Sequence, residues 1–499
     1  MQRIHEIPKL HAYRTPDAVC LYQQDGTSVS YGELWQSVQE AAQWLTIQGV
    51  RPGHRVMLVA ENCAEHVALL FACSLIGAWP VGVNARLSAT EIRAIAEHSE
   101  PFLLIFTTHC SPAAQQHAQA FGARPIKAPS FHKEDQYAIY RPDAAAEASG
   151  QAEQVATLVY TSGTTGAPKG VMVTHRGLLH FAGVSSQSRK LTPSDIAYAA
   201  LPLSHIFGIA TVLLATLYAG ASLVLRARFD PQDLLKSFAQ PGITILQGVP
   251  TMFVRLMDAL PSERPETPKL RYVYTGGAAL DPALKKRVEQ RFGQPMHHGY
   301  GITEYAGSMF VTRIDAPRTD TSAGYAVDGV ELMIVKEGKK ISTPGVDGDI
   351  LIRGPGVMLG YYRSPEQTRQ ALLSDGWLNT GDIGHVDADG ALFLTGRSKD
   401  LIIRSGFNVY PLEIEAVLNA FPGIRLSAVV GKSASDGNEE VVAFYEAEHP
   451  DAIDHTALRE FVAQRLAPYK RPSQYIYIEA IPTTASGKLR KEPLKSRFS

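Results

Sequence analysis

The chain has 499 residues and a mass of 54.3 kDa, and 45% of its residues are hydrophobic and 19% charged. This length and composition predict a globular protein of two or three domains. Forty-eight basic side chains against forty-nine acidic ones give a net charge of −1, which argues against nucleic acid or an anionic membrane surface as a partner.

The N-terminal residues M-Q-R-I-H-E-I-P-K-L contain no apolar core of the signal-peptide type, so we expect the protein to stay in the cytoplasm. The cysteines are scattered without a C-x-x-C pair. This pattern argues against a disulfide framework or a zinc site and predicts buried, reduced thiols. The four are Cys20, Cys63, Cys73 and Cys110.

Strand and helix patterns alternate through the first part of the chain. Residues 29–34 (V-S-Y-G-E-L) close a hairpin-like opening and begin a helix that runs to about Ile47. Strands are then predicted at 55–59, 79–83 and 102–106, with helices at 63–76 and 89–98. This order predicts an α/β fold with a mostly parallel sheet and helices on both of its faces.

The stretch Y-T-S-G-T-T-G-A-P-K-G at residues 160–170 has the composition of a phosphate-binding loop. Its glycines allow close approach of the backbone to a ligand, its hydroxyls donate hydrogen bonds, and its lysine supplies a positive charge. The spacing is not that of a Walker loop. A Ser/Gly surface turn is the alternative, but an apolar, β-prone run at 155–159 precedes the loop. The phosphate-binding candidates are Thr161, Ser162, Gly163, Thr164, Thr165 and Lys169.

Further strands are predicted at 197–200, 243–247, 272–275 and 296–299, and each ends in small or polar residues. Ligands bind beyond the carboxyl ends of such strands, so T-G-G-A-A and Y-G-I-T-E should share a crevice with the phosphate loop. The uncharged segment 206–225 is long enough to span a bilayer. Gly208 and the turn at 219–221 interrupt it, so we predict a buried helix followed by a strand, with no stable membrane insertion.

Six motifs occur in one order between Tyr160 and Lys488, within a resemblance that runs from Val29 to Lys488: Y-T-S-G-T-T-G-A-P-K-G, P-L-S-H, Y-G-I-T-E, T-G-D, G-R-S-K-D and P-T-T-A-S-G-K. In this combination the chain resembles the adenylate-forming enzymes, the superfamily of acyl-CoA synthetases, peptide-synthetase adenylation domains and luciferases. The resemblance is greatest to a bacterial acid:CoA ligase. It implies a large N-terminal domain at 1–396 that includes a small β subdomain, and a small, mobile α+β domain at 397–499.

The resemblance also implies a two-step reaction with ATP, Mg²⁺ and coenzyme A. A carboxylate attacks the α-phosphate of ATP to give an acyl-adenylate, and a thiol then displaces AMP to give a thioester. Carried over by motif, Lys488 would bridge the carboxylate and the phosphate, Thr303 would touch the α-phosphate, and Glu304 would bind Mg²⁺. Further nucleotide-site residues would be Gly277, Ala278, Tyr300, Asp382 and Arg397, the last two on the ribose hydroxyls.

Each of these assignments has an ordinary alternative. Asp382 has the surroundings of a turn carboxylate, Arg397 those of a surface ion-pair partner, and Lys488 those of a solvated lysine in a basic tail. In the family, Lys399 would be the hinge that rotates the small domain between half-reactions, and Gly406 would leave room for pantetheine. Ser405 replaces the first of two glycines found in many relatives, and the segment 430–440 is short and polar, so the binding mode of the CoA nucleotide stays open.

By the same resemblance the acyl group would lie in a neutral, partly aromatic pocket suited to an aryl or medium-chain acid. His205 would be a gate beside the carboxylate or a packed core histidine. Arg255 lies where malonate-activating relatives carry an arginine, although a solvated helix position is the commoner case. The uncharged segment 207–216 disfavours amino-acid substrates. The predicted lining is His205, Phe207, Thr211, Met252, Phe253, Gly276, Gly277, Gly299, Gly307 and Ser308.

Three functions follow from the sequence. The first is an acid:CoA ligase. The second is an enzyme that loads a carrier protein, whose phosphopantetheine thiol is chemically the same acceptor. The third is a non-catalytic nucleotide-binding protein, which the presence of Glu304, Asp382, Arg397 and Lys488 disfavours. The sequence leaves the oligomeric state open between monomer and homodimer.

Overall fold

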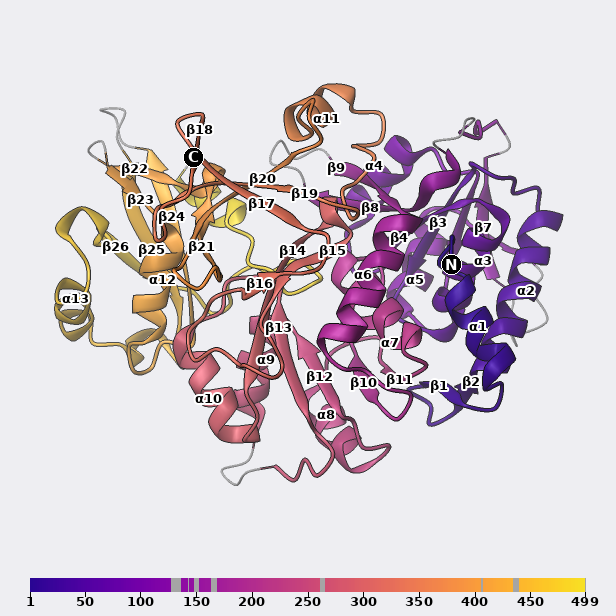
Figure 1. Cartoon of the computed structure of the whole chain (residues 1–499), viewed down its shortest axis with the longest axis horizontal. Helices are drawn as coiled ribbons and strands as arrows, with labels where there is room; N and C mark the ends of the chain where they lie inside the picture. Colours follow the sequence, from indigo (N-terminus) through magenta and orange to yellow (C-terminus); the bar gives the residue numbers. More distant parts are fainter. Residues whose placement is uncertain are drawn as a thin grey trace.

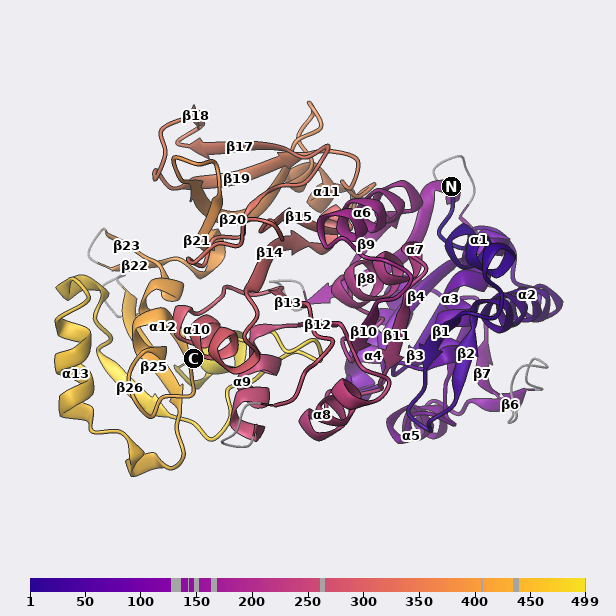
Figure 2. The same cartoon turned by 60° about the horizontal axis from the view of Figure 1, so that its bottom comes forward.

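The structure is a computed structural model that describes residues 1–126, 136–141, 143–147, 152–162, 168–260, 265–404, 407–433 and 439–498. Two large sheets with their helices make up most of the molecule, and an antiparallel sheet lies across one end of them (Figures 1 and 2). The C-terminal strands and helices, coloured yellow and light orange, gather in a lobe of their own beside the second large sheet (Figure 1).

The first large sheet has the strand order β6-β7-β5-β3-β4-β8-β9. Its centre is parallel, because β5, β3, β4 and β8 run in one direction, and its two edges are antiparallel. The strands are β3 (Arg55–Ala60), β4 (Trp79–Asn84), β5 (Leu103–Phe106), β6 (Arg124–Ile126), β7 (Gln136–Tyr140), β8 (Val155–Ser162) and β9 (Pro168–Thr174), and the helices between them are α3 (Ala64–Ile76), α4 (Ala89–Ser99) and α5 (Pro112–Ala120).

The second large sheet has the order β16-β15-β14-β13-β12-β10-β11-β1-β2 and is parallel from β14 to β1. Its strands are β1 (Val19–Tyr22), β2 (Ser28–Ser30), β10 (Ile196–Ala199), β11 (Ser222–Leu225), β12 (Ile245–Gly248), β13 (Tyr272–Gly276), β14 (Met296–Ile302), β15 (Gly307–Val311) and β16 (Tyr325–Ala326). The associated helices are α1 (Glu6–Arg14), α2 (Tyr31–Ile47), α6 (His175–Ser188), a π-helix (Phe207–Leu214), α7 (Ala215–Tyr218), α8 (Pro231–Ala239), α9 (Pro250–Ala259) and α10 (Pro282–Phe292).

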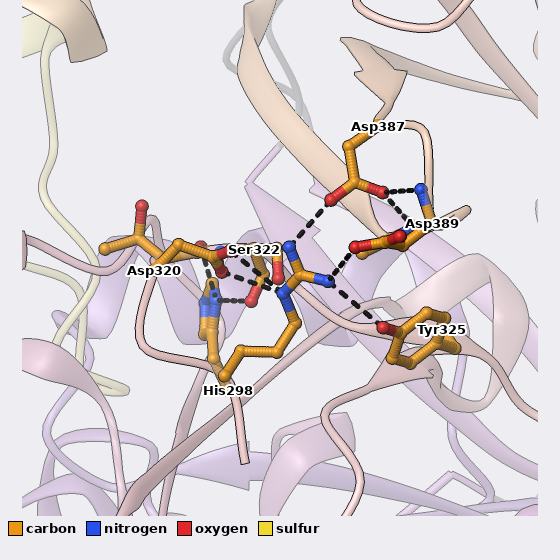
Figure 3. Close-up of polar contacts among 9 residues, drawn as sticks. His298, Asp320, Ser322, Tyr325, Asp387 and Asp389 are labelled. Atoms are coloured by element: carbon orange, nitrogen blue, oxygen red, sulfur yellow. Dashed lines mark hydrogen bonds and ion pairs between the residues drawn. The ribbon is translucent and has the colours of Figure 1, made fainter. Parts of the chain in front are cut away.

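The third sheet is a five-stranded antiparallel subdomain with the order β18-β17-β19-β20-β21. An arginine network ties it to the segment between β15 and β16 (Figure 3). Arg318 Nη2 lies 2.6 Å from Asp320 Oδ2 and 2.7 Å from Asp387 Oδ2, and its Nη1 donates to Tyr325. The elements are β17 (Glu331–Lys336), β18 (Lys339–Ile341), β19 (Gly348–Arg353), α11 (Pro365–Ala371), β20 (Leu378–Val386) and β21 (Leu392–Arg397).

The C-terminal lobe contains a three-stranded sheet, a two-stranded sheet and short helices around a core of its own. Its elements are β22 (Ile402–Arg404), β23 (Phe407–Val409), α12 (Pro411–Asn419), β24 (Leu426–Ser433), β25 (Glu439–Glu446), α13 (His455–Ala463), β26 (Gln474–Tyr477) and α14 (Glu492–Lys495). Single 3₁₀ turns lie at Ala152–Gln154, Thr303–Tyr305, Ser398–Asp400, Pro450–Ala452, Pro468–Lys470 and Ser496–Phe498.

The sequence sets several of these boundaries locally. Ser30 accepts a hydrogen bond from the backbone N–H of Glu33, and the Glu33 carboxylate accepts one from Ser30 N, so a capping box starts α2. Ser88 and Glu91 start α4 in the same way. Gly77 ends α3 in the left-handed conformation, at φ 76°.

The predicted α/β class is confirmed, including the small β subdomain and the α+β C-terminal part. The uncharged segment forms the buried π-helix, α7 and β11, as predicted. Among the described residues, no helix combines the length and the apolar composition needed to cross a membrane. The proposed domain boundary falls at Arg397, the last residue of β21.

Candidate active site

A partly open cavity lies beyond the carboxyl ends of the parallel strands β13 and β14. Lys488 is the charged residue of its lining, which otherwise combines aromatic rings, an imidazole, hydroxyls and glycines. The lining residues are His205, Ile206, Phe207, Thr211, Tyr274, Gly276, Gly277, Gly301, Thr303, Gly307, Ser308 and Lys488. The T-G-G-A-A and Y-G-I-T-E segments therefore meet here, and the C-terminal part of the chain contributes Lys488.

Two glycines shape the cavity in different ways. Gly277 has φ +79°, and a Cβ built on it would lie 3.4 Å from Lys488 Cε, so a side chain here would be strained and would fill the space next to the lysine. A Cβ on Gly299 would lie 2.2 Å from Tyr274 Oη. Gly299 therefore packs beneath the Tyr274 side chain. The sequence predicted it in the cavity lining, but it is not among the residues that line the cavity.

Lys488 reaches the cavity on the segment 482–488 (P-T-T-A-S-G-K), here called the lysine loop. Two hydrogen bonds hold this loop against the N-terminal part: Thr251 Oγ1 donates to Gly487 O at 2.8 Å, and Arg86 Nη2 donates to Ala485 O at 3.1 Å. Burial, with the nearby positive charge of Arg397, lowers the pKa of the Lys488 ammonium to about 8. Lys488 is thus a cation at neutral pH in a site that offers it little solvent.

His205 is a neutral imidazole in this arrangement. Burial and the charge of Lys488 lower the pKa of His205 to about 3. The backbone N–H of Phe207 donates to His205 Nδ1 at 3.2 Å, so the ring proton is carried by Nε2. His205 therefore presents an N–H donor in the cavity wall next to the lysine.

Asp382, Arg397 and Tyr300 form a polar cluster near the cavity, in which Asp382 and Tyr300 are buried and Arg397 is exposed. Arg397 Nε donates to Asp382 Oδ1 at 2.8 Å, and Tyr300 Oη donates to Asp382 Oδ2 at 2.5 Å. Asp382 raises the pKa of Arg397, and burial followed by the Asp382 charge raises the pKa of Tyr300. Asp382 is thus 5% exposed and accepts hydrogen bonds from two side chains, unlike the solvated turn carboxylate of the alternative interpretation.

Glu304 lies in the 3₁₀ turn that follows β14, and Tyr361 orients its carboxylate. Tyr361 Oη donates to Glu304 Oε1 at 2.8 Å, and the Lys169 ammonium lies 5.3 Å from the centre of the Tyr361 ring. The lysine of the phosphate loop and the predicted metal ligand thus meet on one tyrosine. A carboxylate held in this way beside a buried hydroxyl, Thr303, offers the oxygen donors that Mg²⁺ prefers.

The phosphate loop connects the antiparallel strands β8 and β9. Thr161 pairs with Lys169, and the Ser162 backbone pairs with Pro168, so the two ends of the loop are closed by a buried hairpin. Gly163, Thr164 and Thr165 lie outside the described residues, as does the Ser162 side chain. The predicted buried strand before the loop is confirmed by β8.

Other predicted residues lie away from the cavity. Phe253 is buried in a hydrophobic cluster with residues of α8, α10 and the second large sheet, and Met252 packs against Gly248. Arg255 is exposed, and its charge interacts with Glu446 of the C-terminal lobe, so it does not supply a cation to the acyl cavity.

Three further residues are those that the sequence predicted for the nucleotide site, the hinge and the thiol site. Ala278 follows Gly277, and its carbonyl oxygen lies 3.3 Å from His298 Nε2. Lys399 is exposed between β21 and β22, at the joint of the two parts. Gly406 lies outside the described residues.

Sequence reasoning missed four contributors to the site: Tyr274, Tyr361, Arg86 and Thr251. None lies in one of the matched motifs. Tyr274 had a usable signal, because it immediately precedes T-G-G-A-A at the end of a predicted strand. The other three reach the site through contacts between segments far apart in the sequence.

The fold and this cavity together define an enzyme that activates a carboxylate with ATP. The chain matches the AMP-binding enzyme family over residues 9–362 and the AMP-binding enzyme C-terminal domain over residues 413–488. It is 32% identical to a feruloyl-CoA synthase from an Amycolatopsis species, over 98% of each chain. The chain therefore belongs to the AMP-binding enzyme family, the adenylate-forming superfamily, and is an AMP-forming acid–thiol ligase of the acyl-CoA synthetase type.

Solved structures agree with this assignment. ATP-bound MatB from Rhodopseudomonas palustris superposes with a TM-score of 0.87 at 28% identity, covering 100% of this chain and 99% of that one. An anthranilate CoA ligase in complex with anthranoyl-AMP also gives a TM-score of 0.87, at 25% identity, covering 99% and 97% of the two chains. ATP, Mg²⁺ and coenzyme A are accordingly the nucleotide, metal and acceptor of the reaction class.

Proposed function

We propose that the protein converts an aryl or medium-chain monocarboxylic acid into its acyl-CoA thioester in the cytoplasm, with AMP and pyrophosphate as products. The observation that carries this proposal is the lining of the cavity, which contains Phe207 and Tyr274 and in which Lys488 is the charged residue. Such a wall holds an apolar acyl group by contact, while the lysine attracts its carboxylate. The glycines leave flat surfaces for a ring.

Two features of the wall argue against other acids. The described lining contains no carboxylate to hold an α-amino group, which disfavours amino acids. Arg255 is exposed and is not among the residues that line the cavity, which disfavours a dicarboxylic acid held at its distal end. Ser308 Oγ and Tyr274 Oη, 3.1 Å apart, provide a polar contact for a ring substituent.

In the first step a carboxylate oxygen forms a bond to the α-phosphorus, the bond from that phosphorus to the bridging oxygen breaks, and pyrophosphate leaves. Lys488 holds the carboxylate against the phosphate and neutralises charge as it develops. His205 Nε2–H donates to the acid, and Thr303 donates to the α-phosphate. Asp382 accepts from the ribose hydroxyls, and Arg397 donates to them. Glu304 would hold Mg²⁺, which supplies charge neutralisation at the phosphates when bound.

In the second step a thiolate attacks the acyl carbon and AMP leaves with the bonding electrons. Lys399 lies at the joint where rotation would withdraw the lysine loop and bring the Gly406 segment to the cavity. Coenzyme A is the acceptor of the proposed reaction. A carrier-protein phosphopantetheine presents the same thiol and is the second candidate, supported by the adjacency of the joint to the exposed edge of β22 and β23.

The experiment measures pyrophosphate release with Mg-ATP over aryl, straight-chain and dicarboxylic acids, with and without CoA, for wild type and Lys488→Ala. We expect release with an aryl or medium-chain acid, dependence on Lys488, and AMP plus a thioester when CoA is added. A dicarboxylic or amino acid as the best substrate would refute the proposed acid class. Adenylate formation without acylation of free CoA would assign the carrier protein as acceptor.

A further inference from the structure

Two cysteines that are 47 positions apart in the sequence lie side by side at one end of the first large sheet. Cys63 follows β3 and is the N-cap residue of α3, and Cys110 lies in the loop between β5 and α5. β3 and β5 are parallel neighbours, so the loops that leave their carboxyl ends meet. The two thiols hydrogen-bond each other, and Cys110 Sγ also donates to Thr107 O at 3.4 Å.

A histidine completes a set of three soft or borderline ligands. A nitrogen of the His109 ring and the Sγ atoms of Cys63 and Cys110 all lie within 4.8 Å of one another. In a tetrahedral zinc site, with Zn–S of about 2.3 Å and Zn–N of about 2.05 Å, two sulfurs are about 3.8 Å apart and a sulfur and a nitrogen about 3.6 Å. Side-chain rotations that shorten the separations by about 1 Å at most would therefore reach coordination geometry.

The surroundings of the cluster suit a bound cation. Cys63 is buried, Cys110 is partly buried and His109 is exposed, so the site has a protected base and an entry from solvent. Glu65 Oε2 lies 3.1 Å from His109 Nε2. A carboxylate on the imidazole of a ligating histidine is a recurrent partner in zinc sites, because it fixes the orientation of the ring.

We propose that Cys63, His109 and Cys110 form a binding site for a thiophilic divalent cation, with Zn²⁺ as the best-fitting ion and Glu65 as the residue that positions His109. None of these residues lines the acyl cavity. The ligand chemistry also separates the site from that of Mg²⁺, since thiolates and imidazole select zinc-like ions whereas Mg²⁺ requires oxygen donors.

The sequence argued against such a site because no C-x-x-C pair occurs. In this fold the cysteines are close in space although they are far apart in the sequence. The parallel pairing of β3 and β5 brings together the two loops that carry them, whereas a zinc ribbon carries its paired cysteines close together in the sequence. A bound ion would tie the β3–α3 loop to the β5–α5 loop. It would stabilise the folded protein, because the unfolded chain separates the ligands.

The test uses the full-length, untagged protein, kept reduced with a non-thiol phosphine so that the two thiols stay available. Co²⁺ is titrated while thiolate-to-cobalt charge-transfer absorption is followed, and Zn²⁺ affinity is measured by competition with a chromophoric chelator. Cys110→Ser and His109→Ala remove ligands, and Glu65→Gln tests the positioning role. Cys73→Ser is the matched control, since Cys73 is a buried cysteine outside the cluster.

We expect one equivalent of Co²⁺ with thiolate absorption in wild type and in Cys73→Ser. Cys110→Ser should lose that absorption and bind Zn²⁺ at least about 100-fold more weakly, and Glu65→Gln should weaken binding about 10- to 100-fold. His109 is exposed, so His109→Ala removes a ligand with less risk to folding than the substitution of a partly buried cysteine. Circular dichroism checks that both variants are folded. Absence of thiolate absorption in reduced wild type, or unchanged Zn²⁺ affinity in folded His109→Ala, would overturn the proposal.

Discussion

The lowered pKa of Lys488 predicts how the first half-reaction depends on pH. The ammonium titrates at about 8 in the observed arrangement, whereas an exposed lysine does so above 10. Since a lowered lysine pKa means that the charge is lost as pH rises through that value, about 90% of the site is protonated at pH 7 and about 10% at pH 9. We expect kcat/KM for adenylation to fall about tenfold between these two pH values.

The assay is acid-dependent exchange of pyrophosphate into ATP without CoA, at constant free Mg²⁺, from pH 6 to 9.5. His205 contributes no limb in this range because its pKa is about 3. Lys488→Arg is the matched variant: the guanidinium stays charged throughout, so its lower activity should be flat across pH 7–9. A flat profile in wild type, or the same fall in Lys488→Arg, would refute the assignment of this limb to Lys488.

Three further variants test separate contacts. Asp382→Asn removes the charge that orients the ribose side and should raise Kd for ATP about 10- to 100-fold by calorimetry; unchanged affinity would contradict its role. Tyr361→Phe removes the hydrogen bond to Glu304 and should raise the Mg²⁺ concentration for half-maximal pyrophosphate release about tenfold, and an unchanged requirement would contradict that. Arg86→Ala should slow adenylation about five- to tenfold but leave thioester formation from supplied acyl-adenylate intact, because it removes a hydrogen bond to the lysine loop. Arg228→Ala is the control, since Arg228 also pairs with Glu61 but does not contact the lysine loop, and it should not slow adenylation. Equal effects of the two substitutions would refute the importance of the Arg86 contact.

The sequence predicted most elements because each pattern is local. The strand at 55–59 and the helix at 63–76 differ by one residue from β3 and α3, since apolar runs and a C-terminal glycine mark their ends. The predicted lining was less accurate. Phe253 is buried in the hydrophobic cluster with α8, α10 and the second large sheet instead, because an apolar pattern does not show which of two neighbouring cores a helix residue enters.

Contacts across large sequence distances escaped prediction for a common reason. Tyr361 meets Glu304 from 57 positions away, and Arg86 meets the lysine loop from 399 positions away. Neither Tyr361 nor Arg86 lies in one of the motifs. Their contacts depend on how the sheets and the C-terminal lobe pack against one another. The residues that were found from sequence are those whose ligand contacts require a fixed local backbone, as with Gly277 and its positive φ.

The electrostatics of the cavity suggest why the proposed cycle would run in order. Moving the Lys488 charge beside Arg397 costs at most about 3 kcal/mol, the equivalent of its lowered pKa, and less in fact because part of the residue keeps contact with solvent. The hydrogen bonds from Arg86 and Thr251 to the lysine loop offset only part of this cost. A bound carboxylate and triphosphate provide the remaining attraction, so they favour the closed arrangement by binding it better than the open one. Once pyrophosphate leaves, that anionic charge would fall while the two cations remain, which would favour the proposed rotation at Lys399 as the next event.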